Sequence, residues 1–162
     1  MFIDTETTGL QPLEVDLVGV SFCTSEDASY YIPCGHNTGE EQLPCAEILA
    51  ALKPILEDAQ YKKYLHNAKY DILVLAHHGI TLAGLALDTL VGANLIIKEW
   101  QSAGLKKLSH AFFNEEMLTF EDVVKINKYK DFSALEAELV SIIAKVEELN
   151  DNETHKIKEQ NQ

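Results

Sequence analysis

The sequence contains no arginine. All thirteen of its basic residues are lysines, and they are outnumbered by 26 aspartates and glutamates. Because the forked guanidinium is the group that reads guanine edges, sequence-specific readout of DNA is not expected. The formal net charge of −13 also disfavours tight binding to phosphates through clustered cations. A carboxylate-rich site with bound cations would nevertheless invert the local potential and accept a phosphate on an acidic protein.

Long apolar runs and secretion signals are also absent. No apolar run approaches the ~20 residues that cross a bilayer, so we expect a soluble protein without a membrane partner. The first residues lack the positive start and apolar stretch of a signal peptide, which predicts a cytoplasmic chain.

Cysteine is scarce, with three residues at Cys23, Cys34 and Cys45. An odd number without a CxxC pair predicts reduced thiols and argues against a disulfide framework. Together with His36, the last two would offer three zinc ligands at a spacing that matches no familiar four-ligand pattern. We therefore do not expect a zinc site.

The amount and spacing of apolar residues suit a single globular domain. The hydrophobic fraction is 46% and the charged fraction 24%, which are ordinary values for a domain with one core. No repeat or Pro/Gly-rich linker divides the chain. We predict one domain over residues 1–149, followed by a polar and disordered tail over residues 150–162.

Hydrophobic periodicity predicts a mixed α/β order of elements. Alternating, β-branched segments predict strands, and the first three are expected to form an antiparallel meander. Apolar residues at helical spacing, one run of them ending at a Gly79 cap, predict helices. The predicted strands are 2–4, 15–22, 29–33 and 61–65, and the predicted helices are 46–56, 68–79, 85–97, 105–113 and 135–149.

Two short acidic motifs carry the candidate chemistry. Asp4 and Glu6 are separated by one residue in an extended segment, so their side chains point to the same face and can meet at one cation. Oxygen ligands of this kind suit hard divalent ions such as Mg²⁺. Two solvated acids at a strand end are the alternative interpretation.

The second motif is the segment HNAKYD, where a strand passes into a helix and Asp71 falls in the first helical turn. Its simpler interpretation is a helix start, with Asn67 as the cap and Asp71 complementing the helix dipole. The occurrence of the two motifs together and in this order favours the catalytic interpretation of both.

In combination, these segments resemble the proofreading 3′→5′ exonuclease domain of family A DNA polymerases, the bacterial DNA polymerase I type. The resemblance covers Phe2 to about Phe132, most of the chain. It depends on FIDTETTGL, DLVGVSF, YYIPCGH, LHNAKYDILVL followed by HGI, DTL, and GLKKLS before LTFEDV.

This resemblance implies a ribonuclease H-like fold, in which a mixed sheet of three antiparallel strands plus parallel strands is flanked by helices. It also implies that Asp4, Glu6 and Asp71 are three of four catalytic carboxylates, which hold two divalent cations, Mg²⁺ or Mn²⁺. Such a pair of ions generates hydroxide and stabilises the leaving 3′ oxygen.

The same resemblance implies the residues that bind substrate. It places Leu10 against the terminal base, Asn67 and Tyr70 beside the terminal nucleotide, and Thr5 with them. Apolar and aromatic contacts tolerate any base, which suits an enzyme that removes any mispaired 3′ end.

The chain departs from the family in its last third. The family carries its fourth carboxylate and a water-orienting tyrosine in a Tyr-x-x-x-Asp pattern on a late helix, and no such pattern follows Phe132. The expected tyrosine position holds Ile143, and the expected aspartate position holds Glu147. Glutamate offers the same oxygens on a longer arm, so Glu147 is a weak candidate for the fourth metal ligand; the alternative is an amphipathic helix with a solvated acidic face.

Three functions therefore follow as hypotheses. The first is a metal-dependent 3′→5′ exonuclease acting on single-stranded or frayed DNA. The second is a degenerate exonuclease fold that binds nucleic acid or a polymerase without cutting. The third is trimming of RNA 3′ ends, since nothing in the sequence identifies a reader of the 2′-hydroxyl. Because the polymerase region is missing from this chain, either a separate polymerase region supplies DNA synthesis or the domain acts alone.

Overall fold

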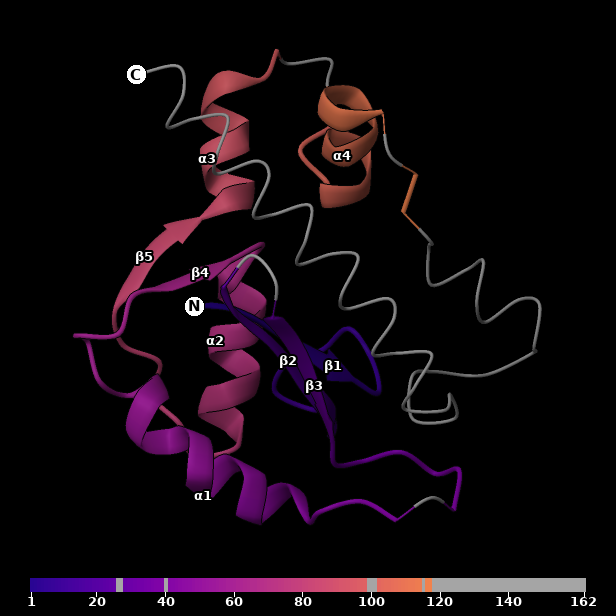
Figure 1. Cartoon of the computed structure of the whole chain (residues 1–162), viewed down its shortest axis with the longest axis vertical. Coiled ribbons are helices and arrows are strands. Elements are labelled where there is room, and N and C mark those ends of the chain that lie inside the picture. The colour runs from indigo at the N-terminus through magenta and orange to yellow at the C-terminus, as the bar shows by residue number, and fades with distance from the viewer. Residues whose placement is uncertain (26–27, 40, 99–101, 115, 118–162) are drawn as a thin grey trace.

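A computed structural model of the chain describes residues 1–25, 28–39, 41–98, 102–114 and 116–117 (Figure 1). The helix predicted over 135–149, the tail predicted over 150–162, and the candidates Ile143 and Glu147 lie outside the described residues. These expectations stay predictions.

The described part contains one five-stranded sheet with the order β3-β2-β1-β4-β5 (Figure 1). The first three strands form the predicted antiparallel meander, and β4 and β5 continue the sheet in parallel. The mixed sheet predicted from the sequence is therefore confirmed. The strands are β1 (Phe2–Thr7), β2 (Leu17–Ser25), β3 (Ala28–Pro33), β4 (Lys63–Leu65) and β5 (Leu85–Asp88).

The helices match their predicted positions closely, apart from one. In the described ranges they are α1 (Cys45–Leu56), α2 (Ala68–His77), α3 (Thr89–Ile96) and α4 (Leu105–Phe113). A search of the described residues finds no helix that is long and apolar enough to cross a membrane.

The prediction of one helix over residues 85–97 is wrong in its first part. Residues Leu85–Asp88 form β5, which pairs in parallel with β4, and the helix begins only at Thr89. The Asp88 side chain accepts the backbone N–H groups of Leu90 and Val91, as an N-cap residue does. The strand depends on pairing with a distant segment, and a short apolar run by itself does not distinguish it from a helix.

The main core lies between the inner face of the sheet and the helices α1 and α2. Ile3 of β1 belongs to this core, together with residues from β2, α1 and α2. Alternation along β1 then places Thr5 and Thr7 on the same inner face as Ile3, and Asp4 and Glu6 on the outer face. The other core residues are Val15, Leu17, Val20, Leu49, Leu56, Leu65, Ala68, Val74, Leu75 and Ile80.

The prediction of reduced thiols is wrong for two of the three cysteines. Cys34 and Cys45 form a disulfide, with their Cα atoms 4.8 Å apart. The pairing follows from the fold, because the chain turns back after β3 and begins α1 beside it. Cys34 is anchored there by its backbone N–H, which donates to the Val18 carbonyl. The number and spacing of the cysteines do not show that Cys34 and Cys45 lie close together in the fold. Cys23 is buried and lies outside the disulfide.

Candidate active site

Both acidic motifs lie where the sheet divides between β1 and β4. These two parallel strands are paired at Phe2 and Tyr64, and the chain then leaves β1 toward β2 and leaves β4 toward β5. In open α/β sheets, ligands bind at the carboxyl ends of strands where the connections run in opposite directions. The end of β1 carries the first motif, and the segment after β4 carries the second.

Asp71 connects helix α2 to strand β1 at this division. Its Oδ1 atom accepts the backbone N–H of Thr5 at 3.0 Å and the Thr5 hydroxyl at 2.7 Å. The Asp71 carboxylate therefore occupies the place that a neighbouring strand would fill, and it ties the first turn of α2 to the middle of β1. Thr5, predicted to bind substrate, is buried, and its side chain is directed to Asp71.

Asp71 is a buried acid, and burial disfavours its ionised form. It is 2% exposed, and burial raises its pKa from 3.8 to about 6, with a smaller contribution from the charge of Asp88. The two hydrogen bonds from Thr5 act in the opposite direction, because they stabilise the ionised form. A buried carboxylate with a raised pKa and a defined charge neighbour is typical of functional sites.

Asp4 and Glu6 lie on the outer face of β1, opposite β2. Their cross-strand partners are Ser21 and Gly19. Glu6 is 6% exposed. Ser21 Oγ is buried and has no hydrogen-bond partner among the described atoms, so the row that contains Asp4 keeps a polar group available for a ligand.

Tyr70 lies within the electrostatic influence of all three predicted catalytic acids. Its hydroxyl is bonded to Thr7 Oγ1 at 2.5 Å and to the Gly9 carbonyl at 2.6 Å. Burial raises the pKa of the Tyr70 phenol, and the charges of the three acids raise it further. The charges of Asp4, Glu6 and Asp71 thus all act on the pKa of this one phenol.

Two predicted substrate-binding residues are exposed beside this aromatic ring. Leu10 is 90% exposed and directly follows Gly9, whose carbonyl accepts a hydrogen bond from the Tyr70 hydroxyl. Asn67 is exposed and has left-handed backbone angles, with φ 66°. Such a conformation in an Asn is frequent at functional turns.

Asn67 does not cap α2 with its side chain, contrary to the simpler interpretation of the motif. Instead, the Asp88 carboxylate accepts the backbone N–H groups of Asn67 and Ala68 at 3.1 and 2.9 Å. The same carboxylate caps α3. Asp88 therefore holds the N-termini of two helices at once, and one of these carries Tyr70 and Asp71.

The sequence prediction missed two residues near Glu6. Tyr31 of β3 and His36 are joined by a 2.7 Å hydrogen bond between the phenol oxygen and Nε2. Tyr31 pairs across the sheet with Ser21, which itself pairs with Asp4, so all three side chains share the outer face. The available signal was alternation along β3, but it assigns a face only when the register with β2 is known.

The donor set is chemically suited to a hard cation. Asp4 and Glu6 present carboxylate oxygens on one face, Ser21 Oγ lies in the same row, and Asp71 lies at the edge of β1. Oxygen donors with room for waters are what Mg²⁺ prefers. Within the described ranges, no three His, Cys, Asp or Glu side chains form a group that could hold an ion by themselves.

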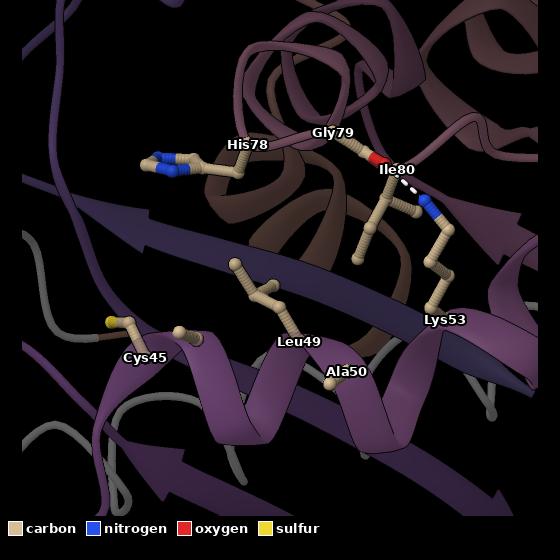
Figure 2. A pocket seen from close by; sticks show the side chains of 8 residues that line it. Cys45, Leu49, Ala50, Lys53, His78, Gly79 and Ile80 are labelled. Carbon is tan, nitrogen blue, oxygen red and sulfur yellow. Dashed lines mark hydrogen bonds between the residues drawn. The ribbon is translucent and has the colours of Figure 1, made fainter.

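Two hollows of the surface lie away from these acids. One of about 440 Å³ lies between α1 and the end of α2 (Figure 2), where Leu49 and Ile80 face each other and Lys53 Nζ donates to the Gly79 carbonyl at 2.5 Å. The other, of about 610 Å³, lies beside α2, β5 and α3 and is lined mainly by apolar side chains. Neither is lined by Asp4, Glu6 or Asp71.

Comparison with known proteins leads to one family. A model of the family described as 3′-5′ exonuclease matches residues 2–141. DNA polymerase I of Chloroflexus aurantiacus is 42% identical over 140 residues, which cover 83% of this chain and 14% of that protein. DNA polymerase I of Pseudomonas aeruginosa is 36% identical over 124 residues, which cover 74% of this chain and 14% of that protein. The chain thus spans about a seventh of the length of these relatives.

A solved structure shares the fold. NrnC of Brucella melitensis with bound Mg²⁺ aligns with a TM-score of 0.71 and 20% identity, covering 98% of this chain and 71% of that chain. At this level of identity the likeness concerns the fold, and it confirms the ribonuclease H-like arrangement expected from the sequence.

Proposed function

The chain belongs to the 3′-5′ exonuclease family found in DNA polymerase I, and from this premise we propose that it hydrolyses 3′-terminal phosphodiester bonds. The proposed substrate is single-stranded or frayed DNA, and the products are nucleoside monophosphates. The chain corresponds to a small part of its polymerase relatives, so synthesis is assigned to a polymerase region that lies outside the matched segment.

One observation carries this proposal. The hydrogen bonds from Thr5 to Asp71 tie the two motifs, 66 residues apart, to a single point of the sheet. They bring the third acid to the strand that bears Asp4 and Glu6, at the end of the sheet where ligands of such folds bind. A separate arrangement of solvated acids would not need a buried carboxylate between a strand and a helix.

Each residue of the site has a proposed role. Asp4 and Glu6 would hold a divalent cation from one face of β1, and Asp71 would contribute from the strand's edge. When bound, a pair of Mg²⁺ or Mn²⁺ ions supplies hydroxide from water and stabilises the departing 3′ oxygen. The bound Mg²⁺ of the NrnC structure supports this choice of ion.

The exposed residues would position the end of the strand. Leu10 extends into solvent beside the Gly9 carbonyl that receives the Tyr70 hydroxyl. An apolar side chain next to an aromatic ring can stack on or wedge against any base. Asn67, presented by its left-handed backbone, would contact the terminal nucleotide from the start of α2.

The proposal is tested with a 3′-labelled single strand, in Mg²⁺ or Mn²⁺, on the unaltered protein and the Asp4→Ala and Asp71→Ala variants. We expect metal-dependent shortening by the unaltered protein and a loss of at least ~10²-fold in each variant, because the reacting groups would no longer be positioned. Glu47→Ala, at an exposed acid of α1, is the matched control and should keep full activity.

Two results would contradict the proposal. Shortening that persists equally in both variants would identify a contaminating nuclease. No shortening by a folded protein would leave the binding module, and that hypothesis is then tested by fluorescence anisotropy with a labelled strand at low salt.

A further inference from the structure

We propose that Tyr31, held by His36, is a positioning residue that fixes the carboxylate of Glu6 for metal binding. This inference deepens the proposed function and rests on it. Neither residue belongs to the acidic motifs. Tyr31 lies on the outer face of the sheet, where Glu6 is buried, and His36 of the following loop is bonded to it.

Gly19 creates the space that Tyr31 occupies. It lies directly opposite Glu6 in the β1–β2 pair. A Cβ atom built on Gly19 would lie 2.1 Å from the Tyr31 hydroxyl oxygen, so the phenol lies over the backbone of the residue facing Glu6. Directly paired residues of antiparallel strands have their Cβ positions about 5 Å apart, which puts the phenol oxygen within reach of a glutamate side chain.

His36 restricts where the Tyr31 hydroxyl can go. Its Nε2 bonds the phenol oxygen at 2.7 Å, and the two rings meet edge to face. His36 is 6% exposed, and its loop is fixed by Gln42, which accepts the His36 N–H and donates to the His36 carbonyl. The phenol is therefore held at both its ring and its oxygen.

The electrostatics of the site agree with this geometry. Burial raises the pKa of Tyr31, and the charge of Glu6 raises it further, as expected for a neutral phenol held close to a carboxylate. Carboxylates that bind metals are themselves oriented by hydrogen-bonding neighbours, and loss of such a neighbour commonly costs 10–100-fold in metal affinity or activity. Tyr31 is placed to act on Glu6 in this way.

The decisive variant is Tyr31→Phe, compared with Tyr30→Phe. Tyr30 is the preceding residue of β3, is 51% exposed, and stacks on Phe22. Mn²⁺ affinity is measured by electron paramagnetic resonance of the free ion, and cleavage is measured as kcat and KM for a single strand. For Tyr31→Phe we expect ~10-fold weaker Mn²⁺ binding and a lower kcat, with KM for DNA unchanged. Tyr30→Phe should match the unaltered protein.

Two further variants probe how the phenol is held. His36→Gln retains a hydrogen-bonding side chain and should lose less Mn²⁺ affinity than His36→Phe. Combining His36→Phe with Tyr31→Phe should add little to either single change, because both act through the same hydroxyl. Circular dichroism melting of each variant verifies that it is folded at the assay temperature.

The possible outcomes separate this inference from the proposed function. If the unaltered protein binds Mn²⁺ and cleaves DNA, and Tyr31→Phe does both equally well, the role of Tyr31 is refuted while the nuclease stands. If the unaltered protein binds Mn²⁺ without cleaving, weaker Mn²⁺ binding by Tyr31→Phe still supports the role of Tyr31. If the unaltered protein binds no Mn²⁺, both are refuted.

Discussion

The two faces of strand β1 differ in what their neighbours provide. On the inner face, Ile3 is packed into the main core, and Thr5 and Thr7 are bonded to side chains of α2. On the outer face, Asp4 and Glu6 are opposed by a serine whose hydroxyl has no partner among the described atoms, and by a glycine. We propose that adjacent residues of this strand divide between stability, on the inner face, and metal binding, on the outer face.

This division explains why the acids can be tolerated in a small domain. Burying a carboxylate costs free energy, and the inner face offsets that cost with a continuous apolar core. Asp71 is the exception, because it comes from the inner side and approaches β1 at its edge. The following substitutions test whether stability and activity divide between the faces in this way.

Ile3→Ala should produce the largest change in stability. Ile3 is 4% exposed, and truncating a buried Ile to Ala typically costs 2–5 kcal/mol through lost burial and the cavity left behind. Urea denaturation measures this change. At a temperature where the variant stays folded, its kcat should remain within a few-fold of the unaltered value.

Asp4→Ala is the counterpart on the other face. It should leave the free energy of unfolding within ~1 kcal/mol while removing most of the activity. Comparable losses of activity in both folded variants would contradict the division between the faces.

Asp71→Asn should give an opposite pair of effects, with a gain of stability and a loss of activity. The pKa of Asp71 is raised from 3.8 to about 6 in the folded protein, and each pKa unit corresponds to ~1.4 kcal/mol. Neutral asparagine avoids the cost of burying a charge, and its oxygen can still accept both bonds from Thr5. We therefore expect a stabilisation of up to ~3 kcal/mol at pH 8 in metal-free buffer.

The stabilisation by Asp71→Asn should depend on pH. Well below its ordinary pKa of 3.8 the carboxyl is protonated in both the folded and unfolded states, so the unaltered protein pays no penalty there. Between about pH 4 and 6 the folded state binds the proton more tightly, and stability falls as pH rises. The stabilisation by Asp71→Asn, measured by urea denaturation at several pH values, should therefore be much smaller near pH 4 than at pH 8. An advantage that is the same at pH 4 and pH 8 would show that the charge is not its cause.

Local pattern was sufficient to predict some of these features. Alternation along β1 predicted that Asp4 and Glu6 share a face, and helical spacing predicted α4 over Leu105–Phe113. Both signals depend on residues close in sequence, where side-chain direction follows from backbone geometry. The resemblance in turn supplied the fold class, which the comparisons confirmed.

Features that depend on contacts between distant segments were not predicted from the sequence. Strand β5 exists because β4 pairs with it, and its four residues show no alternation of their own to distinguish them from a helix. The disulfide between Cys34 and Cys45 requires the end of β3 to lie beside the start of α1. Likewise, Tyr31 approaches Glu6 only through the register of two strand pairs. In each case the fold had to be known before the contact could be inferred.

Thr5→Val should have a smaller effect, confined to the contact between β1 and the first turn of α2. Valine keeps the shape of the side chain and the backbone N–H, but it removes the hydroxyl that donates to Asp71 Oδ1. Since that bond lowers the pKa of Asp71, its loss should move the pKa further above 6 and cost about 1–2 kcal/mol at pH 8. Carboxyl ¹³C chemical shifts in metal-free protein measure the pKa directly.

The matched control for this change is Thr7→Val. Thr7 lies on the same inner face, but its hydroxyl is bonded to Tyr70 rather than to Asp71. Thr7→Val should therefore leave the pKa of Asp71 in place. With Thr5→Val, the acidic limb of the pH–rate profile should move to higher pH, and kcat should largely recover once Asp71 is ionised. An unchanged acidic limb would mean that ionised Asp71 is not required for cleavage, and the bond from Thr5 would then only fasten α2 to the sheet.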